Sequence, residues 1–232
     1  MEGTKSTEPG ICLFNGEMSA QDLCQIILVR HGQTEWNRVE RFRGQADIPL
    51  NETGLQQAAA TGLRIVQEWQ PSAVYSSPLS RAFRTAEAIA QHHNLVVQAC
   101  PGLADIHYGE WQGLTANEVQ QLWPDEFHTW FHSPQIAVIP GGETLADLRH
   151  RAMQTVFNLA LGHYRETIVL VGHTVINRII LLAALGLGNN RFWHLRQDTC
   201  AINVLKVNQG DFTLVSLNDT CHLRGLLLDR IL

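Results

Sequence analysis

The sequence has little charge and no excess of positive charge. Asp, Glu, Lys and Arg make up 17% of its 232 residues, against roughly 25% in an average soluble protein. The 22 acidic residues outnumber the 17 Lys and Arg residues, so the formal net charge is −5. A general nucleic-acid binder needs surplus cations to neutralise phosphates. We therefore expect no nucleic-acid partner, although a small basic pocket is compatible with this composition.

Cysteines are also few, and their spacing shows no pairing pattern. None of the five lies in a C-x-x-C pair, which excludes a zinc ribbon or a dense disulfide framework and favours a reducing compartment. They are Cys12, Cys24, Cys100, Cys200 and Cys221. No apolar run reaches the roughly 18 residues of a transmembrane helix, and the apolar cluster at 11–14 is too short for a signal-peptide core. We expect a cytoplasmic protein without a membrane partner.

The hydrophobic content is that of an ordinary globular protein. Apolar residues make up 45% of the chain, within the usual range of about 45–50%. The polar, mixed composition of residues 1–22 predicts a poorly ordered N-terminal extension. Residues 23–232 contain no repeat and no linker, and we expect them to form a single domain.

Short apolar runs alternate with helical patterns after residue 22. The strongest run covers residues 167–171 (TIVLV), and similar runs occupy 26–29, 73–75 and 95–97. Runs of this kind favour buried strands of a mostly parallel sheet. Residues 201–217 predict a hairpin that turns at 208–210.

Helical periodicity fills the segments between the strands. Thr53 is expected to cap the first helix, with Leu55, Ala58 and Leu63 on its apolar stripe. Further helices are predicted after Pro78, from a capping box at 144–147, and over residues 175–185. Residues 115–140 are expected to form a small helical cap insertion. The pattern predicts an α/β three-layer sandwich, with about six strands in a mostly parallel sheet and helices on both faces.

Three of the predicted strands end on side chains that can bind phosphate. The first ends on Arg30 and His31, the 167–171 strand ends on His173, and the 73–76 strand leads into a helix whose first turn carries Arg81. In open α/β sheets, ligands bind beyond the carboxyl ends of the strands. Two guanidinium groups, two imidazoles and the amides of helix N-termini suit a dianionic phosphoryl group.

The sequence offers neither a Gly-rich phosphate loop nor an acidic cluster for magnesium. Phosphoryl transfer without a metal would make an imidazole the nucleophile. Neighbouring cations disfavour a protonated imidazole, so Arg30 and Arg81 should keep His31 neutral. A general acid must protonate the leaving oxygen, and the candidates are Asp105 and Glu110.

Six ordered blocks of the sequence resemble the histidine phosphatase superfamily, in its phosphoglycerate-mutase-like branch. The resemblance extends from about residue 26 to residue 223. The blocks are VRHG at 29–32 with Thr34, Trp36 and Asn37; DIPL at 47–50 with Gly54, Gln57 and Ala58; SSPLSRA at 76–82 with Thr85 and Ala86; GEWQG at 109–113; GGET at 141–144; and VGH at 171–173.

The resemblance implies a role for each matching residue. His31 would carry the phosphoryl group on a ring nitrogen. Arg30, Arg81 and His173 would grip the phosphoryl group, and Asn37 would assist them. It also implies no cofactor and no metal.

The sequence departs from the family pattern at three positions. The acid falls at Asp105, where Glu is commoner, so the shorter side chain could lie farther from the leaving oxygen or act through water; Glu110 is the second candidate. Arg43 stands where many of these phosphatases carry Gln, and it could contact the phosphate, contact a substrate carboxylate, or face solvent. Thr174 replaces a common Gly, and its hydroxyl and backbone N–H could still face the phosphate.

Asn177 and Arg178 follow one turn into the helix after His173. Helix-solvating residues are the simplest interpretation of both. A carboxylate ligand is the alternative for Arg178.

These observations predict a metal-independent phosphomonoesterase that acts on a small phosphorylated metabolite, including one that bears a carboxylate. One alternative is a phosphoglycerate mutase of the same fold. Mutases of this family usually carry a longer insertion after the acid, and the compact 105–141 segment favours a phosphatase. A non-catalytic module that binds phosphorylated ligands is the other alternative, and it would normally have lost the nucleophile or an arginine.

Overall fold

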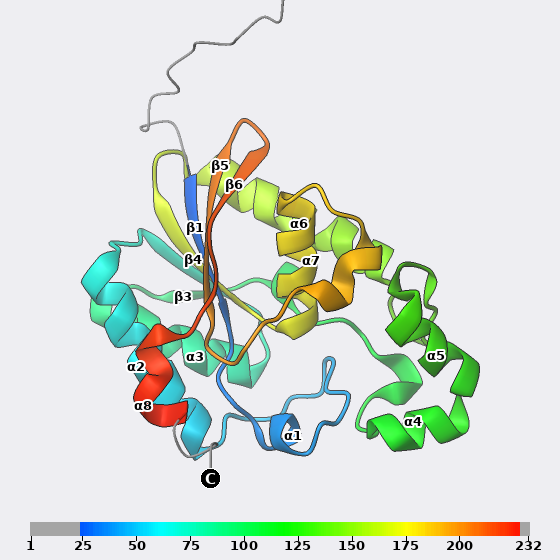
Figure 1. Cartoon of the computed structure of the whole chain (residues 1–232). Coiled ribbons are helices and arrows are strands. Elements are labelled where there is room, and N and C mark those ends of the chain that lie inside the picture. Colours follow the sequence, from blue (N-terminus) through cyan, green and yellow to red (C-terminus); the bar gives the residue numbers. More distant parts are fainter. Residues whose placement is uncertain (1–23, 228–232) are drawn as a thin grey trace, which may run out of the picture.

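The computed structural model describes residues 24–227, in which a six-stranded sheet lies between two layers of helices (Figure 1). The strand order is β3-β2-β4-β1-β5-β6, with β1, β2, β3 and β4 parallel and β5 and β6 joined as an antiparallel hairpin. The strands are β1 (Cys24–Arg30), β2 (Ala73–Ser76), β3 (Val97–Ala99), β4 (Thr167–Gly172), β5 (Ile202–Asn208) and β6 (Asp211–Asp219). The predicted three-layer architecture is confirmed. The predicted extension at residues 1–22 lies outside the described residues.

Helices cover both faces of the sheet, and a separate pair forms the cap. Helices α2, α3 and α8 lie on one side, α6 and α7 on the other, and α4 and α5 stand apart from the sheet (Figure 1). The α-helices are α1 (Glu35–Arg38), α2 (Glu52–Glu68), α3 (Ser80–Ala90), α4 (Ala116–Leu122), α5 (Pro124–His132), α6 (Leu145–Gly162), α7 (Thr174–Ala184) and α8 (Arg224–Leu227). The 3₁₀ helices are η1 (Gln91–His93), η2 (Pro101–Leu103), η3 (Gly109–Trp111), η4 (Pro134–Ile136), η5 (Asn189–His194) and η6 (Cys221–Leu223).

The apolar runs of the central strands are continuous because both faces of the sheet are buried. In β1, Ile27 and Val29 belong to the core that includes Ile65 of α2. The alternate residues Ile26 and Leu28 belong to the core on the side of α6 and α7. Successive side chains of a strand point to opposite faces, so each run supplies two cores at once.

The first long helix differs from its prediction. Asn51, not Thr53, caps α2, because its side chain accepts a hydrogen bond from Gly54 N at 2.9 Å. The predicted stripe is partly wrong as well, since Leu55 and Leu63 are 49% and 52% exposed.

Two polar residues, Gln57 and Thr61, share the buried face of α2 with small and apolar residues. Gln57 is buried and its Oε1 accepts a hydrogen bond from Gln33 N at 2.9 Å. Thr61 is buried and donates to Gln57 O at 2.8 Å. Buried polar groups are tolerated where each finds a partner.

The edge strand β3 also differs from its prediction. It covers Val97–Ala99 rather than residues 95–97, and Val96 is 84% exposed. Within the described sheet the strand pairs only with β2, in a register that places Val97 opposite Val74. An edge strand with one partner does not need the fully apolar sequence of a central strand.

The remaining predicted elements are present. The capping box at the start of α6 is confirmed, with Thr144 Oγ1 accepting from Asp147 N at 3.2 Å. The hairpin is formed by β5 and β6, and α4 and α5 fall in the predicted cap. The cysteines within the described range are free thiols. None of the helices between residues 24 and 227 is long and apolar enough to cross a bilayer.

Candidate active site

The register of the sheet brings the three predicted strand ends to one edge. Arg30 at the end of β1 lies opposite Gly172 at the end of β4, and His31 N donates to Gly172 O at 3.0 Å. On the other side of β4, Ser77 N donates to Val171 O at 3.0 Å. The residues after β1, β2 and β4 are therefore neighbours, as the sequence predicts.

His31 and His173 form a pair of buried imidazoles at this edge. Their ring centroids lie 5.0 Å apart, and the side chains are 1% and 0% exposed. His31 Nδ1 lies 2.6 Å from Gly32 O, and a carbonyl can only accept, so Nδ1 carries the proton. In the neutral ring, Nε2 then keeps its lone pair. His173 Nε2 lies 2.8 Å from Ser77 Oγ.

The environment favours the neutral form of both imidazoles. Burial is the largest cause that lowers the pKa of His31 well below its ordinary value, followed by Arg81, His173 and Arg30. Burial and the same two arginines also lower the pKa of His173. From the sequence, the arginines alone predict that the pKa of His31 is lowered. In the structure, desolvation by burial is the larger cause.

Backbone carbonyls hold the two arginines beside these rings. Arg30 Nη1 donates to Gln197 O at 2.6 Å. Arg81 is fully buried, and its Nη1 and Nη2 each donate at 2.7 Å, to Ala46 O and Gly44 O. Both guanidinium groups are thus fixed in orientation before any ligand binds.

Several buried polar atoms around the imidazoles have no partner within the described part of the chain. They are Arg30 Nε, Arg81 Nε, His173 Nδ1 and Thr174 Oγ1. Leaving a buried polar group unpaired costs about 1–3 kcal/mol, so a group of them in one place needs an explanation. Four polar atoms gathered at one edge of the sheet indicate a binding site for a polar ligand.

A cavity of about 510 Å³ lies at this edge of the sheet, lined by Arg30 and Thr174, the sequence neighbours of the two imidazoles. Of the predicted site residues, Arg30, Asn37, Arg43, Asp105 and Thr174 line it. His31, Arg81 and His173 are buried and do not contribute to this lining. The cap and η5 complete the wall, through residues that include Phe131, Phe192 and Trp193.

Asn37 and Arg43 stabilise the segment that follows His31. Thr34 N and Oγ1 both donate to Asn37 Oδ1, at 2.9 Å each, which leaves the Asn37 amide nitrogen to face a ligand. Arg43 Nη1 donates to Trp36 O at 3.1 Å and to Arg41 O at 3.3 Å. Arg43 lines the cavity, and its hydrogen bonds also stabilise the loop that carries it.

The structure separates the two candidate acids. Asp105 lines the cavity, is 4% exposed, and its Oδ1 accepts from Ile176 N at 3.4 Å. Burial raises the pKa of Asp105, against the opposing effect of Arg81 and Arg43. Glu110 is exposed in η3 and is not part of the cavity lining. The geometry favours Asp105 as the candidate proton donor.

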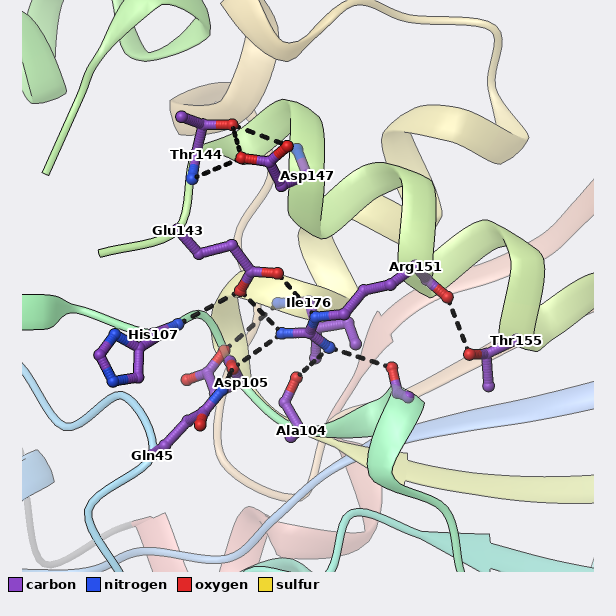
Figure 2. A network of polar contacts seen from close by, with 11 residues as sticks. Gln45, Ala104, Asp105, His107, Glu143, Thr144, Asp147, Arg151, Thr155 and Ile176 are labelled. Carbon is purple, nitrogen blue, oxygen red and sulfur yellow. Dashed lines mark hydrogen bonds and ion pairs between the residues drawn. The ribbon is translucent and has the colours of Figure 1, made fainter. Parts of the chain in front are cut away.

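An ion pair holds the backbone on both sides of Asp105 (Figure 2). Arg151 of α6 contacts both carboxylate oxygens of Glu143, at 2.7 and 2.9 Å. The same guanidinium donates to Ala104 O at 2.8 Å and to Asp105 O at 2.9 Å. Glu143 also accepts from His107 N at 3.3 Å. We call this arrangement of Arg151 and Glu143 the acid-loop clamp.

Neither the acid-loop clamp nor the partner of His173 is predictable from the sequence pattern. Arg151 looks like an ordinary solvating residue of an amphipathic helix. Glu143 and Ser77 lie within recognised blocks, but nothing local assigns them a contact. A Ser that directly follows a buried strand, next to a helix start, is the one signal that could have identified Ser77.

The part of the site that the structure describes offers no cluster of metal ligands. Among residues 24–227, no cluster of three or more His, Cys, Asp or Glu side chains is placed to hold a metal ion. The chemistry available at the site is that of imidazole, guanidinium, hydroxyl and carboxyl groups.

The comparisons with known proteins agree with this geometry. Residues 26–220 match the family described as histidine phosphatase superfamily (branch 1). Phosphoserine phosphatase 1 of Hydrogenobacter thermophilus is 34% identical over 201 residues, which cover 87% of this chain and 95% of that protein. A metal-independent phosphoserine phosphatase of Arabidopsis thaliana is 34% identical over 207 residues, covering 88% and 85% of the two chains.

A solved structure shares the fold across nearly the whole described region. It is a phosphoserine phosphatase variant from Entamoeba histolytica in complex with phosphoserine, with a TM-score of 0.79 and 27% identity. The similarity covers 86% of this chain and 99% of that one. The chain therefore belongs to branch 1 of the histidine phosphatase superfamily and is a phosphatase of the histidine phosphatase type.

Proposed function

We propose that the protein is a metal-independent phosphomonoesterase that hydrolyses small phosphorylated metabolites through a phosphohistidine on His31. The observation that carries this proposal is the group of unpaired buried polar atoms on Arg30, Arg81, His173 and Thr174 around a neutral imidazole. A phosphoryl group supplies acceptor oxygens for the N–H donors among them, and charge-assisted hydrogen bonds from guanidinium groups are among the strongest in proteins.

In the first step, His31 Nε2 attacks phosphorus. Its lone pair is available because Gly32 O holds the Nδ1 proton. The N–P bond forms as the bond from phosphorus to the ester oxygen breaks. Arg30 and Arg81 stabilise the negative charge on the equatorial oxygens, and their fixed orientation needs no reorganisation in the transition state.

Asp105 acts on the leaving oxygen and then on water. Burial raises the pKa of Asp105, which favours its protonated form, and the protonated carboxyl donates its proton to the departing alkoxide. The resulting carboxylate then accepts a proton from water as the water attacks phosphorus. The N–P bond breaks, inorganic phosphate leaves, and His31 and Asp105 return to their initial protonation states.

The substrate class follows from the cavity and the relatives. A volume of about 510 Å³ lies within the range of small-molecule sites, roughly 300–1,000 Å³. Relatives that cover most of the chain are named phosphoserine phosphatases, and one was solved with phosphoserine. Phosphoserine is therefore the first substrate to test.

Phosphate release from O-phosphoserine and p-nitrophenyl phosphate in excess EDTA tests the proposal. We expect full activity after chelation, and acid-labile, base-stable phosphate trapped on the protein. His31→Ala should lower turnover by several orders of magnitude and abolish trapping, whereas the exposed control His132→Ala should do neither. A requirement for added magnesium, or trapping that persists in His31→Ala, would contradict the mechanism.

A further inference from the structure

One arginine at the cavity has no hydrogen-bond acceptor among residues 24–227. Arg178 of α7 lines the cavity one helical turn after Thr174, beyond the phosphoryl-binding end. Its guanidinium carbon lies 5.1 Å from the ring centre of Phe192 and 5.2 Å from that of Trp193. Among the described residues it makes no hydrogen bond and no ion pair, and its Nε is buried without a partner.

The aromatic contacts fix Arg178 but do not satisfy it. The face of an aromatic ring attracts a guanidinium cation electrostatically. This contact does not supply hydrogen-bond acceptors for the guanidinium N–H donors. The wall is firmly held, since Trp193 Nε1 donates to Trp130 O at 2.9 Å and its ring stacks on Phe131. The guanidinium is thus held against the aromatic wall, and its N–H donors have no acceptor among the described residues.

The acidic side chains that act on Arg178 from a distance are already engaged elsewhere. Its charge is influenced by Tyr108, Asp105 and Asp198. Asp198 accepts from Arg196 Nε at 2.8 Å, and its second oxygen accepts from the side chain of Asn218 at 2.9 Å. Asp105 is the proton donor of the proposed mechanism.

The other arginines that border the cavity have protein acceptors. Arg30 donates to Gln197 O, and Arg43 donates to the carbonyls of Trp36 and Arg41. Arg41 donates to Gly113 O at 2.7 Å, and Arg196 pairs with Asp198. Arg178 differs from all of them in having no acceptor within the described chain.

We propose that Arg178 binds a carboxylate of the substrate, so that the cavity selects phosphate esters of small carboxylic acids. A carboxylate is planar and monoanionic, and it matches the two parallel donors on the edge of one guanidinium. A second phosphoryl dianion would leave negative charge uncompensated here, because Arg178 is the only arginine of the cavity lining that lacks an acceptor among the described residues. The proposal rests on the proposed phosphatase activity and defines its substrate class.

Two substrates that differ only at the carboxylate provide the test. 3-Phosphoglycerate carries a carboxylate where glycerol 3-phosphate carries a hydroxymethyl group. The measured quantity is the ratio of their kcat/KM values in wild type, in Arg178→Met and in the control Arg196→Met. Methionine keeps much of the side-chain volume, and Arg196 borders the same cavity but is exposed and paired with Asp198.

We expect wild type to prefer 3-phosphoglycerate, and Arg178→Met to lower the ratio by about 10- to 100-fold, mainly through KM. The ratio for Arg178→Lys should lie between those of wild type and Arg178→Met, because lysine keeps the charge but lacks the planar pair of donors. Arg196→Met should leave the ratio within about twofold of wild type. An unchanged ratio in Arg178→Met, or an equal fall in Arg196→Met, would overturn the carboxylate site.

A binding measurement separates this inference from the proposed activity. Calorimetric titration of the same two compounds into His31→Ala, with and without Arg178→Met, compares their affinities without turnover. Tighter binding of 3-phosphoglycerate that depends on Arg178 supports the subsite even if hydrolysis fails. Equal affinities for the two compounds would overturn the inference while leaving phosphatase activity intact.

Discussion

The imidazole rings of His31 and His173 lie 5.0 Å apart with their planes inclined by 58°. Both side chains are almost completely buried, and both pKa values are lowered well below the ordinary value for histidine. A pair of neutral imidazoles therefore forms the buried centre of the site. This arrangement makes folding itself sensitive to pH.

Acid should destabilise the protein through these two rings. In the unfolded chain each imidazole binds a proton below its ordinary pKa of about 6.5, whereas in the folded protein it stays neutral. The two rings should therefore make their full contribution to the free energy of unfolding above about pH 6.5. The free energy of unfolding should be lower at pH 5 than at pH 7. Each ring contributes up to about 1.4 kcal/mol per pH unit, and the raised pKa of Asp105 opposes the trend.

Urea denaturation at pH 7 and pH 5 measures this slope. His31→Gln should show a smaller difference between the two pH values than wild type. Thr85→Val is the matched control, because it removes the hydroxyl that accepts from Gly32 N and leaves both imidazoles in place. The control should lose similar stability at both pH values, and an unchanged slope in His31→Gln would contradict the burial argument.

Asp105→Asn should discriminate between leaving groups. An alkoxide needs a proton to depart and a p-nitrophenolate does not, so kcat/KM should fall by about 10²- to 10⁴-fold for O-phosphoserine and far less for p-nitrophenyl phosphate. kcat/KM for O-phosphoserine in wild type should also decline as the pH rises through the raised pKa of Asp105. That decline should be absent in Asp105→Asn.

Glu110→Gln provides the control for this experiment. It removes the charge of an exposed carboxylate outside the cavity lining, so both substrates should retain wild-type kcat/KM. If Glu110→Gln shows the leaving-group dependence and Asp105→Asn does not, the proton donor is Glu110.

The sheet and the position of the site are predictable because their signals are local. The apolar runs of β1 and β4 reflect burial on both faces, and each run ends directly on the polar residues of the site. Parallel pairing then brings Arg30 opposite Gly172 without further information. Recognised blocks add the identity of the family.

The rest depends on partners that are distant in the sequence. Gln57 is buried because Gln33 N, 24 residues earlier, donates to its side chain. Arg178 is held by aromatic rings of η5, and periodicity alone predicts a solvating residue there. Asn177 is likewise predicted to be a solvating residue of its helix, but it is fully buried. Its side chain packs against Gly172, where a Cβ added to the glycine would lie 2.5 Å from Asn177 Oδ1.

Arg43→Gln should weaken all substrates to a similar degree. From sequence alone, Arg43 could bind a substrate carboxylate, but its Nη1 is committed to Trp36 O and Arg41 O. Its charge also acts on Arg30, His173 and Asp105 at the phosphoryl end. We expect kcat/KM to fall for 3-phosphoglycerate and glycerol 3-phosphate alike, with their ratio within about threefold of wild type. A selective loss with 3-phosphoglycerate would instead assign the carboxylate to Arg43.

The acid-loop clamp should act on catalysis through Asp105. Arg151→Met removes the donors to Ala104 O and Asp105 O and leaves Glu143 without its cation. The Asp105 carboxyl should then lose its position relative to the leaving oxygen. We expect kcat/KM for O-phosphoserine to fall by about 10- to 100-fold, with a much smaller loss for p-nitrophenyl phosphate, since small displacements of a reacting group can cost about 10²-fold.

A double-variant cycle separates positioning from general loss of structure. If Arg151 works through Asp105, adding Arg151→Met to Asp105→Asn should cost little more than Asp105→Asn alone, because the interaction energy cancels the second loss. Arg149→Met is the matched control: the residue lies two positions earlier on α6 and donates to Leu187 O and Asn189 Oδ1, away from the acid loop. It should leave the leaving-group dependence as in wild type. A mispositioned acid does not slow a reaction whose leaving group needs no proton. Additive losses in the double variant, or equal losses on both substrates in Arg151→Met, would therefore mean that the acid-loop clamp only stabilises the fold.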